Sequence, residues 1–520
     1  MIYENRPALT GLQAAWQSLP ATVLALISAL ILIWTLPVGF FQHGHAALLA
    51  VGGIGLLRNL WLLTNQLRSF YYRHSAFERL RKQERALAQP YPQRLFVVVP
   101  SYREDPLVTQ RAIAALSKEV SLLPCQVFLL FSVASVQEMA QIRGLVRQYG
   151  RRDHLKFNFM EQSEGKRMAL GQALRLVSRE YLRISDWHAD APNDIVVLMD
   201  GDTEVRPGTF RKSLGFFKLL PDLGALTTNE EGHMLTDEAA EGAINPWFNL
   251  KFAKRHTMMS SHALSGRVMT LTGRFSVFRA GPILHTNFIQ RIETDHIDHW
   301  IFGRFRFLMG DDKSTWFDLL AGGWRMLYLP DVCVNCLETR GGNFFSLSKD
   351  LMFRWFGNMA RNNWRALSLG PQRMPFFIWL TVLDQRVSMW TSLIGPLGAL
   401  VGSLMFGPGY LALYLAWVLT TRTIFLWLLV PNGFVIRPIH IGLQMYDQWV
   451  GSVLKISATL LMNRQSWSKA NNSTKSGQFQ RASARDFLTW HRLWSYVAYF
   501  IFAILLLTGA VIFPAQFHLI

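Results

Sequence analysis

The stretch IVVLMDGDT, at residues 195–203, most constrains the fold of this chain. Its first five residues are apolar, and four of them are branched. A continuous apolar run of this length predicts a strand buried on both faces, as in a parallel sheet. Open α/β sheets bind their ligands at the carboxyl ends of such strands. Asp200 and Asp202 stand at that end, where they predict either a site for a divalent cation with its diphosphate or a simple polar turn.

Composition indicates a membrane protein. Half of the 520 residues are hydrophobic and 17% are charged, against about 25% in a typical soluble protein. The net charge of +18 suits nucleic acid, anionic lipid or a polyanionic ligand. The basic residues gather beside apolar segments, which favours lipid or a polyanion and no nucleic acid. Three cysteines cannot form a disulfide framework, and the CxxC pair Cys333 and Cys336 has no second pair to complete a zinc site.

Apolar segments lie toward both ends of the chain. Residues 21–40 and 46–63 are each about as long as a membrane helix. A short turn separates them, so we expect a helical hairpin. The basic segment 66–89 follows and marks the cytoplasmic side of the membrane. Further along the chain, residues 389–406 and 410–430 are again apolar enough to span.

The segment at residues 440–462 is apolar but contains Asp447, Gln448 and Lys455. The basic segment after it, residues 463–492, should be cytoplasmic, which requires an even number of crossings before it. We therefore expect residues 440–462 to lie at the interface or to re-enter the bilayer. Residues 494–513 are expected to form a final span.

Between these segments, apolar runs alternate with helical patterns. Strands are expected at residues 94–100, 126–131 and 156–160, and helices at residues 109–118 and 168–181. This alternation predicts a mostly parallel α/β sheet.

The predicted organisation is an α/β domain inserted between α-helical transmembrane segments. Its parts are an N-terminal transmembrane hairpin (1–66), a cytoplasmic α/β domain (67–336), amphipathic interface helices (337–388), transmembrane and interfacial helices (389–462), a basic cytoplasmic segment (463–493) and a C-terminal transmembrane helix (494–520).

Three charged pairs fall in the α/β domain. A metal diphosphate needs carboxylates for the cation and cationic groups for the phosphates. A further carboxylate that opens a helix after a separate strand can deprotonate an incoming hydroxyl. The pairs with these properties are Asp200 and Asp202, Lys166 and Arg167, and Asp311 and Asp312.

The order of these pairs between membrane helices resembles the processive membrane glycosyltransferases, the family that includes cellulose, chitin and hyaluronan synthases. The resemblance covers residues 94–365 and implies a domain of GT-A type. It implies that Asp200 and Asp202 are the metal-binding DxD motif and that Asp312, with Asp311, is the general base of the TED/GDD motif. It further implies nucleotide-sugar binding by Ser101, Arg103, Glu104, Asp105, Lys166, Arg167 and Arg354, and acceptor binding by Trp355, Gly273 and Arg274.

Two positions depart from the family pattern. The glutamine of the QxxRW motif is Leu351, so one contact to the diphosphate or acceptor is missing. The acidic motif usual after the second strand is replaced by FSVAS at residues 131–135, with Ser132 where relatives that use UDP carry an aspartate that reads the base. This absence weakens the case for UDP and leaves room for a guanine nucleotide.

Several strings extend the resemblance to the alginate (mannuronan) synthase catalytic subunits, among them GDDKSTW at residues 310–316 and DQRVSMWTSL at 384–393. This resemblance implies GDP-mannuronate as donor, a growing β-1,4 mannuronan chain as acceptor, and export through the bacterial inner membrane. It also implies a divalent cation, Mg²⁺ or Mn²⁺, and a separate cyclic-di-GMP-binding regulatory subunit.

Two alternatives stay open. One is a related β-glycan synthase that uses a UDP-sugar, and the other is a catalytically inactive membrane or transport subunit. A uronate donor would need cations for its carboxylate, for which Arg274, Arg267 and Lys254 are candidates. Arg58 and Arg422, within apolar segments, are expected either to reach the interface or to face an anionic polymer.

Overall fold

A computed structural model describes residues 10–36, 46–148, 153–162, 165–184, 194–236, 242–299, 302–307, 310–339, 342–463, 494–495 and 498–503. The chain forms two compact units. The first, here called the helical unit, contains residues 1–66, 384–460 and 479–520, and the second, here called the α/β unit, contains residues 67–383 and 461–478.

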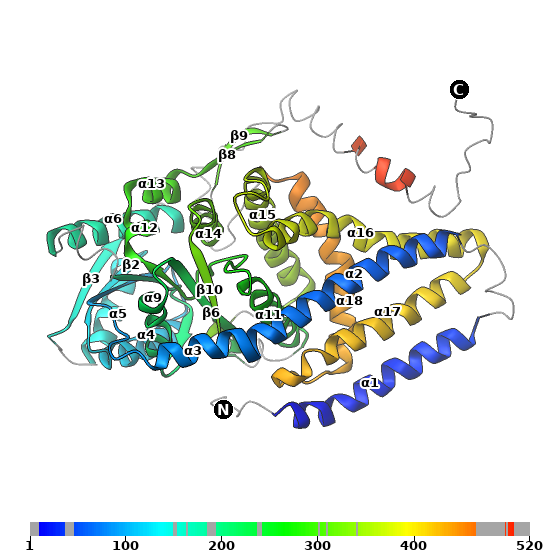
Figure 1. Ribbon diagram of the computed structural model, residues 1–520, viewed down its shortest axis with the longest axis horizontal. Coiled ribbons are helices and arrows are strands. Elements are labelled where there is room, and N and C mark those ends of the chain that lie inside the picture. The colour runs from blue at the N-terminus through cyan, green and yellow to red at the C-terminus, as the bar shows by residue number, and fades with distance from the viewer. Residues whose placement is uncertain are drawn as a thin grey trace. The chain divides into compact units, whose positions relative to one another are not determined.

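The α/β unit is built on an eight-stranded sheet with the order β3-β2-β1-β4-β7-β6-β10-β5 (Figure 1). The β3-β2-β1-β4 half is parallel, as is the pair of β6 and β10, whereas β7 and β5 run antiparallel to their neighbours. Its strands are β1 (Arg94–Pro100), β2 (Gln126–Val133), β3 (Leu155–Glu161), β4 (Ile195–Leu198), β5 (Thr203–Val205), β6 (Leu223–Met234), β7 (Ser276–Arg279) and β10 (Arg325–Glu338).

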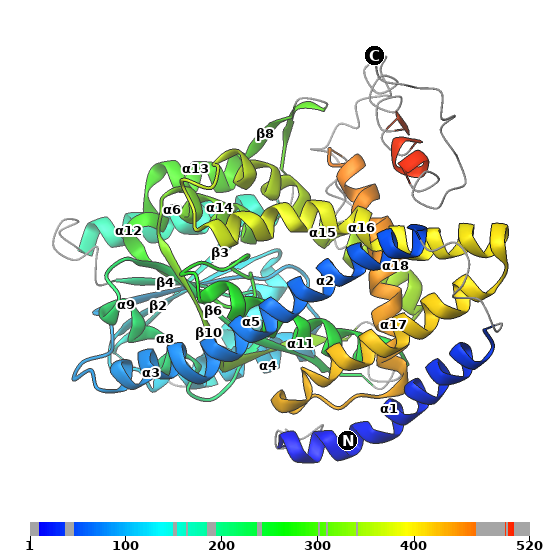
Figure 2. The ribbon, with the colours of Figure 1, turned by 45° about the vertical axis from the view of Figure 1, so that its right-hand side comes forward.

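Helices cover the sheet on both sides (Figure 2). They follow the predicted alternation with strands, although the chain after β4 adds the antiparallel strands that make the sheet mixed. The helices of this unit are α3 (Phe77–Arg85), α4 (Pro106–Ser121), α5 (Val136–Gln148), α6 (Lys166–Ile184), α8 (Thr209–Leu214), α9 (Phe216–Leu219), α11 (Ile244–Ala263), α12 (Ala280–Leu284), α13 (Thr286–Thr294), α14 (Asp311–Ala321) and α15 (Phe344–Ser368), with a separate hairpin of β8 (His296–His299) and β9 (Gly303–Arg306).

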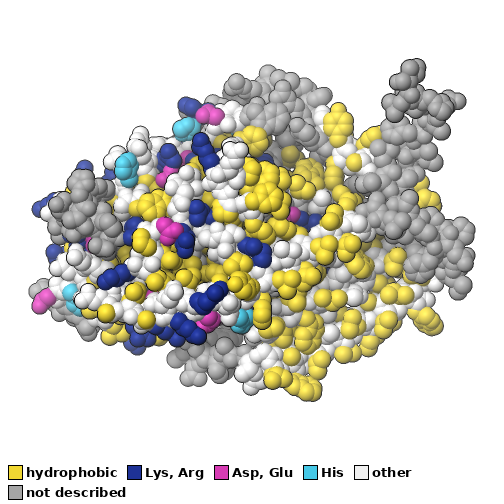
Figure 3. All heavy atoms as spheres, in the orientation of Figure 1, with side chains coloured by type: hydrophobic (Ala, Val, Ile, Leu, Met, Phe, Trp, Pro, Cys, Tyr) yellow, Lys and Arg dark blue, Asp and Glu magenta, His cyan; other side chains and the backbone are white. Residues whose placement is uncertain are grey.

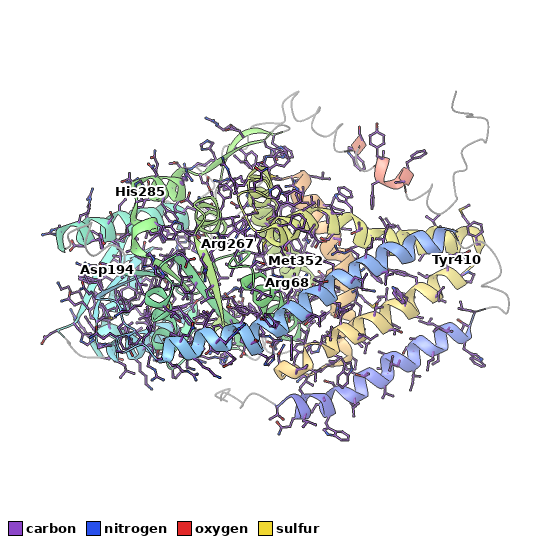
Figure 4. The ribbon with its side chains drawn as sticks, viewed as in Figure 1. Arg68, Asp194, Arg267, His285, Met352 and Tyr410 are labelled. Atoms are coloured by element: carbon purple, nitrogen blue, oxygen red, sulfur yellow. The ribbon has the colours of Figure 1, made fainter. Side chains whose placement is uncertain are left out.

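The central strands form the core because almost all of their residues are apolar. Every residue of β4 is buried, and so are the first six residues of β1. The two strands pair in parallel. A buried ion pair holds their amino ends together, with Arg94 Nη2 2.7 Å from Asp194 Oδ2 (Figure 4). The strands and helices that the sequence predicts for this domain are present, with ends that differ by a few residues.

Two predicted boundaries differ from the structure. The domain boundary after residue 336 falls inside β10, which continues to Glu338 and lies between β6 and β5 in the sheet. The amphipathic helix therefore begins only at Phe344, and the compact α/β unit continues to Leu383. The boundary before residue 67 coincides with the division between the two units.

The helical unit contains α1 (Gly11–Trp34), the first part of α2 (Ala46–Tyr71), most of α16 (Phe376–Phe406), α17 (Gly409–Trp427) and α18 (Pro438–Leu460). Hydrophobic side chains gather over α1 and α17 (Figure 3). Within the described residues, three helices are long and apolar enough to cross a membrane, at Gly11–Trp34, Phe376–Phe406 and Gly409–Asn432.

These helices begin earlier than the predicted spans, since α1 begins ten residues before residue 21 and α16 begins before residue 389. The α2 and α18 helices are not among the three, so the hairpin and the interfacial placement of residues 440–462 stay predictions. Of the predicted final span, only residues 494–495 and 498–503 lie within the described residues.

Polar contacts inside the helical unit satisfy two of its arginines. Arg58 of α2 pairs with Asp384 of α16. Arg422 of α17 donates to Gln448 Oε1 of α18 at 2.6 and 2.9 Å. The expectation that Arg58 reaches the interface alone is therefore replaced by an ion pair between two helices.

Candidate active site

A pocket opens at the carboxyl ends of the neighbouring strands β1 and β4. The strand order reverses at this point, because β2 and β3 follow β1 on one side while β4 lies on the other. Strand order of this kind leaves a crevice where the loops diverge, and ligands bind there in open α/β sheets. The pocket is lined by the ends of these strands, by residues 271–273, and by the first turns of α6 and α14. Four predicted charged residues line it, namely Lys166, Asp200, Asp311 and Asp312.

Backbone hydrogen bonds fix Asp200 at the end of β4. Its neighbours continue the pairing with β1, from Met199 N to Val98 O at 3.1 Å and from Gly201 N to Pro100 O at 3.2 Å. Asp200 N itself donates to Gly273 O at 2.9 Å. A Cβ at position 201 would lie 2.9 Å from Ser101 Oγ, so the residue between the two aspartates has to be glycine.

Lys166, at the start of α6, joins the acidic residues of the pocket. Its Nζ lies 2.7 Å from Asp200 Oδ1 and 3.2 Å from Asp311 Oδ2. Burial alone would lower the pKa of Lys166, but the Asp200 and Asp311 carboxylates outweigh it and raise that pKa. The lysine is therefore a permanent positive charge between the two acidic motifs.

Asp312 lies in the first turn of α14, where the helix N-terminus stabilises negative charge. Burial and the neighbouring Asp311 carboxylate nevertheless raise the pKa of Asp312, against the opposing effect of Lys313 and Lys166. A carboxylate with a raised pKa is a stronger base than an ordinary aspartate. Asp312 thus has the chemistry that a general base requires.

Gly273 forms the wall of the pocket beside Asp200. A Cβ on this residue would lie 2.8 Å from Asp200 Oδ2 and 3.0 Å from Lys166 Nζ. Only glycine leaves both charged groups their present positions. The predicted acceptor residue is thus also a spacer that admits the Asp200 carboxylate.

The donor set at Asp200 and Asp202 fits a hard divalent cation. Carboxylate oxygens are the ligands that Mg²⁺ and Mn²⁺ prefer, and in nucleotide sites one or two carboxylates share the metal with substrate phosphates and water. No cluster of three or more His, Cys, Asp or Glu side chains that could hold a metal occurs among the described residues.

The comparisons with known proteins agree on the class of protein. Residues 92–358 match the family model described as glycosyltransferase like family 2. The chain belongs to glycosyltransferase family 2. It is 34% identical to "Glycosyltransferase alg8" of Pseudomonas syringae pv. tomato over 88% of this chain and 91% of that protein, and 33% identical to "Glycosyltransferase alg8" of Azotobacter vinelandii over 88% and 90%.

Among solved structures, this glycosyltransferase is similar to a mannosyltransferase of Pyrobaculum calidifontis in complex with GDP-mannose and Mn²⁺. The TM-score is 0.47 and the identity 15%, over 78% of this chain and 98% of that chain. The family model and the α/β sheet make the domain a GT-A-type glycosyltransferase domain.

The residues of the predicted nucleotide-binding loop after β1 make different kinds of contact in the structure. Ser101 Oγ donates to Glu138 Oε1 at 2.5 Å. Arg103 has φ of 50°, which is uncommon for a residue with a side chain, and its guanidinium lies 5.5 Å from the ring of Tyr102. Asp105 instead caps α4, because its Oδ1 accepts from Leu107 N at 2.8 Å. The cap gives Asp105 a structural role that the sequence interpretation did not assign.

Glu138 is a residue of this glycosyltransferase that the sequence interpretation missed. It lies in the first turn of α5, and its Oε2 accepts from Ala134 N at 3.0 Å. A buried carboxylate therefore accepts a hydrogen bond from the loop after β2, although residues 131–135 themselves contain no acidic residue. This reduces the weight of the missing acidic motif as an argument against UDP.

Arg167 points away from the pocket. Its guanidinium is buried and donates to Ile292 O at 2.9 Å, Arg291 O at 3.2 Å and Ser314 Oγ at 3.0 Å. These contacts tie α6 to α13 and to the first turn of α14. Arg167 thus supports the helix that carries Asp312, and it is not among the pocket-lining residues.

The QxxRW segment lies on α15. Trp355 stacks on Trp247 of α11 with ring centroids 5.8 Å apart, and neither it nor Arg354 is among the pocket-lining residues. Their assignment to the diphosphate and the acceptor therefore stays a prediction.

Arg274 and Asp202 lie together on the far side of Gly273. Arg274 Nη1 lies 2.7 Å from Glu230 Oε2. Burial alone would lower the pKa of Arg274, but its anionic neighbours, Glu230 and Asp202 among them, hold that pKa well above the usual value. Cys333 and Cys336 are free thiols of β10, and burial raises the pKa of Cys336 to about 12.

Proposed function

We propose that this chain polymerises mannuronic acid from GDP-mannuronate into β-1,4 mannuronan, the precursor of alginate, and passes the polymer across the membrane. The main support is one pocket in which Asp200, Lys166, Asp311 and Asp312 meet, within a family 2 glycosyltransferase. Two relatives with more than 30% identity over about nine-tenths of their length bear the name alg8.

The proposed reaction is an inverting displacement at the anomeric carbon of the donor. The acceptor hydroxyl forms the new glycosidic bond, its proton passes to Asp312, and the bond between the sugar and the diphosphate breaks. The raised pKa of Asp312 matches a base that takes a proton from an alcohol. Lys166 stands beside both acidic motifs and contributes positive charge for the leaving diphosphate.

Asp200 and Asp202 would hold a divalent cation, which when bound supplies a Lewis acid for the departing diphosphate. Asp200 belongs to the pocket through its backbone bonds to Gly273 and its contact with Lys166. Whether Mg²⁺ or Mn²⁺ is used is not distinguished by carboxylate ligands, since both are hard cations.

The setting that we propose is the bacterial inner membrane, with several helices crossing the bilayer and the α/β unit in the cytoplasm. Its support is the three apolar helices and the basic residues of segment 66–89, which favour the cytoplasmic side. A separate cyclic-di-GMP-binding subunit is the expected regulatory partner.

The test of catalysis is Asp312→Asn in membranes that contain the full-length chain. Polymer synthesis should be abolished while nucleotide-sugar binding persists, because the amide keeps the size of the side chain and cannot accept the proton. Unchanged synthesis would exclude Asp312 as the base. A wild type that makes no polymer would favour the transport alternative.

The test of the donor is the mass of the nucleotide that membranes release from GDP-mannuronate or from UDP-sugars. Release of GDP only with GDP-mannuronate supports the proposal. A UDP-sugar synthase is the second candidate. The Glu138 carboxylate supports it, because this group contacts the loop after β2, where relatives that use UDP carry an acidic residue. Release of UDP alone would replace the GDP donor by a UDP-sugar.

A further inference from the structure

A buried carboxylate with two arginine partners lies behind Gly273. Oε2 of Glu230, in β6, lies 2.7 Å from Nη1 of Arg255 and 2.7 Å from Nη1 of Arg274. Burial alone would raise the pKa of Glu230, but the two guanidiniums outweigh it and lower that pKa. Glu230 is therefore ionised, and it neutralises one of its two cationic partners.

Arg255 has donors that the protein does not use. Its Nη2 has no hydrogen-bond acceptor among the described residues. That nitrogen is itself buried, but the Arg255 side chain as a whole is 23% exposed and that of Arg274 is 25% exposed, so a ligand would approach the pair from these exposed parts. The neighbouring His256 and Cys336 are neutral, since burial lowers the pKa of His256 to about 3 and raises that of Cys336 to about 12.

The arginine pair lies next to the proposed reaction centre. Arg274 directly follows Gly273, which lines the pocket. Lys313 directly follows Asp312, and burial together with the charge of Arg255 lowers the pKa of Lys313 to about 8, against the opposing Asp312. Arg255 and Arg274 thus form a cationic pair on the same oxygen of Glu230, and Lys313, whose Nζ donates to Met269 O, is close enough to feel the charge of Arg255; these three residues are here called the cationic wall. The carboxylates facing this wall, besides Glu230, are those assigned to the metal and to the base, Asp202 and Asp312.

We propose that Arg255, held beside Arg274 by Glu230, binds the carboxylate of the donor's uronate ring and so selects a GDP-uronate over a neutral GDP-hexose. This inference rests on the proposed function and names the group that reads the sugar. A guanidinium with free donors pairs strongly with a carboxylate. A neutral sugar carries a hydroxymethyl group at that position and leaves the cation without an anionic partner, which is why such sites discriminate well.

Arg267, another expected candidate, uses both terminal nitrogens of its guanidinium within the protein, and only its Nε has no hydrogen-bond partner among the described residues. Its Nη1 and Nη2 each donate at 2.8 Å to a backbone carbonyl, those of Gly266 and Gly323 (Figure 4). Arg267 therefore fixes the turn before β10. The structure assigns the uronate to the Arg255 and Arg274 side of the domain.

The test is equilibrium binding of GDP-mannuronate, GDP-mannose and GDP to the purified full-length protein in detergent. The wild type should bind GDP-mannuronate at least about tenfold more tightly than GDP-mannose. Arg255→Met should weaken GDP-mannuronate binding roughly 10- to 100-fold, the range of a charge-assisted pair, and leave GDP-mannose and GDP unchanged. Arg304→Met, which removes an exposed arginine of β9, is the matched control and should change none of the three.

The outcomes separate the inference from the function on which it rests. A wild type without preference for GDP-mannuronate overturns the donor and the subsite together. A wild type with that preference, kept in Arg255→Met, overturns the subsite alone. If Arg255→Met binds no GDP and is therefore misfolded, Arg255→Lys replaces it. The lysine keeps the charge but loses the fork, so an intermediate, uronate-specific loss supports the subsite and an equal loss for all three ligands overturns it.

Discussion

The ammonium of Lys166 lies 2.7 Å from a carboxylate oxygen of Asp200, the aspartate assigned to the metal. A second carboxylate, Asp311, lies 3.2 Å away on the helix that carries the base. One cation thus joins the DxD and GDD motifs. The charge balance of the pocket depends on this residue, and we therefore expect it to set the affinity for the proposed diphosphate.

Lys166→Met should weaken GDP binding roughly 10- to 100-fold, because it removes a charge-assisted donor and leaves two carboxylates facing the diphosphate. Titration calorimetry of the detergent-solubilised protein measures this change. Lys166→Arg keeps the charge and should lose less affinity than Lys166→Met. Equal affinity in the methionine variant and the wild type would remove Lys166 from the diphosphate site.

Catalysis should need the deprotonated form of Asp312, so kcat/KM should rise with pH through a pKa above the ordinary aspartate value. The free energy of unfolding should change with pH in the opposite direction. A carboxyl whose pKa is raised on folding stabilises the protein below its unfolded pKa, and that contribution is lost as pH rises through the folded pKa. The unfolding free energy of the wild type should therefore fall over this window relative to Asp312→Asn. Parallel pH profiles for the two proteins would contradict a raised pKa.

Gly273→Ala should reduce synthesis at least about tenfold with a folded protein, because its Cβ would stand 2.8 Å from Asp200 Oδ2 and 3.0 Å from Lys166 Nζ. The assay is polymer formation at saturating donor, with Tm as a check of folding. Gly144→Ala is the matched control, since a Cβ on this residue of α5 meets nothing within 4 Å. The control should keep its activity and gain up to about 1 kcal/mol of stability from its helical position.

Glu138→Ala should lower the unfolding free energy by about 1–3 kcal/mol, because it leaves the Ser101 hydroxyl and the Ala134 N–H without their acceptor. Thermal unfolding in detergent measures this loss. Glu138→Gln keeps an acceptor oxygen at the same reach and should restore most of the stability. If the glutamine variant is stable but binds donor poorly, the negative charge itself contributes to nucleotide binding.

In the helical unit, Arg58→Met should leave Asp384 as an unpaired charge among apolar helices. Breaking a buried pair in this way costs about 3–5 kcal/mol, so less protein should accumulate in membranes. The exchanged pair Arg58→Asp with Asp384→Arg should restore accumulation. Equal amounts of the single variant and the wild type would show that the pair is dispensable for insertion.

Much of the fold and part of the site could be predicted from sequence because the signals are local. The apolar run of β4 and the acidic residues after it fixed the position of Asp200, and the alternation of strands and helices fixed the sheet class. The antiparallel strand β7 and the long strand β10 have weaker local patterns and depend on pairing with strands far away in the chain. The boundary after residue 336 was misplaced for this reason.

The residues that sequence reasoning missed or misassigned all act through contacts between distant segments. Glu138 of α5 accepts a hydrogen bond from Ser101 at the end of β1, and Glu230 forms ion pairs with Arg255 and Arg274, which belong to two other segments. Arg167 stands beside Lys166 in the sequence, but the helical step turns it toward α13. Adjacent charges at a helix start face different directions, so a basic pair in sequence is not a basic pair in space.

The backbone bond from Asp200 N to Gly273 O has a consequence for synthesis of the chain. Asp200 emerges from the ribosome long before Gly273, and Asp311 and Asp312 follow later still. A nascent chain that has not reached α14 therefore has neither the complete pocket nor the proposed base. By then α1 and α2 have already been made, so we expect every molecule to reach the membrane before it can consume its donor.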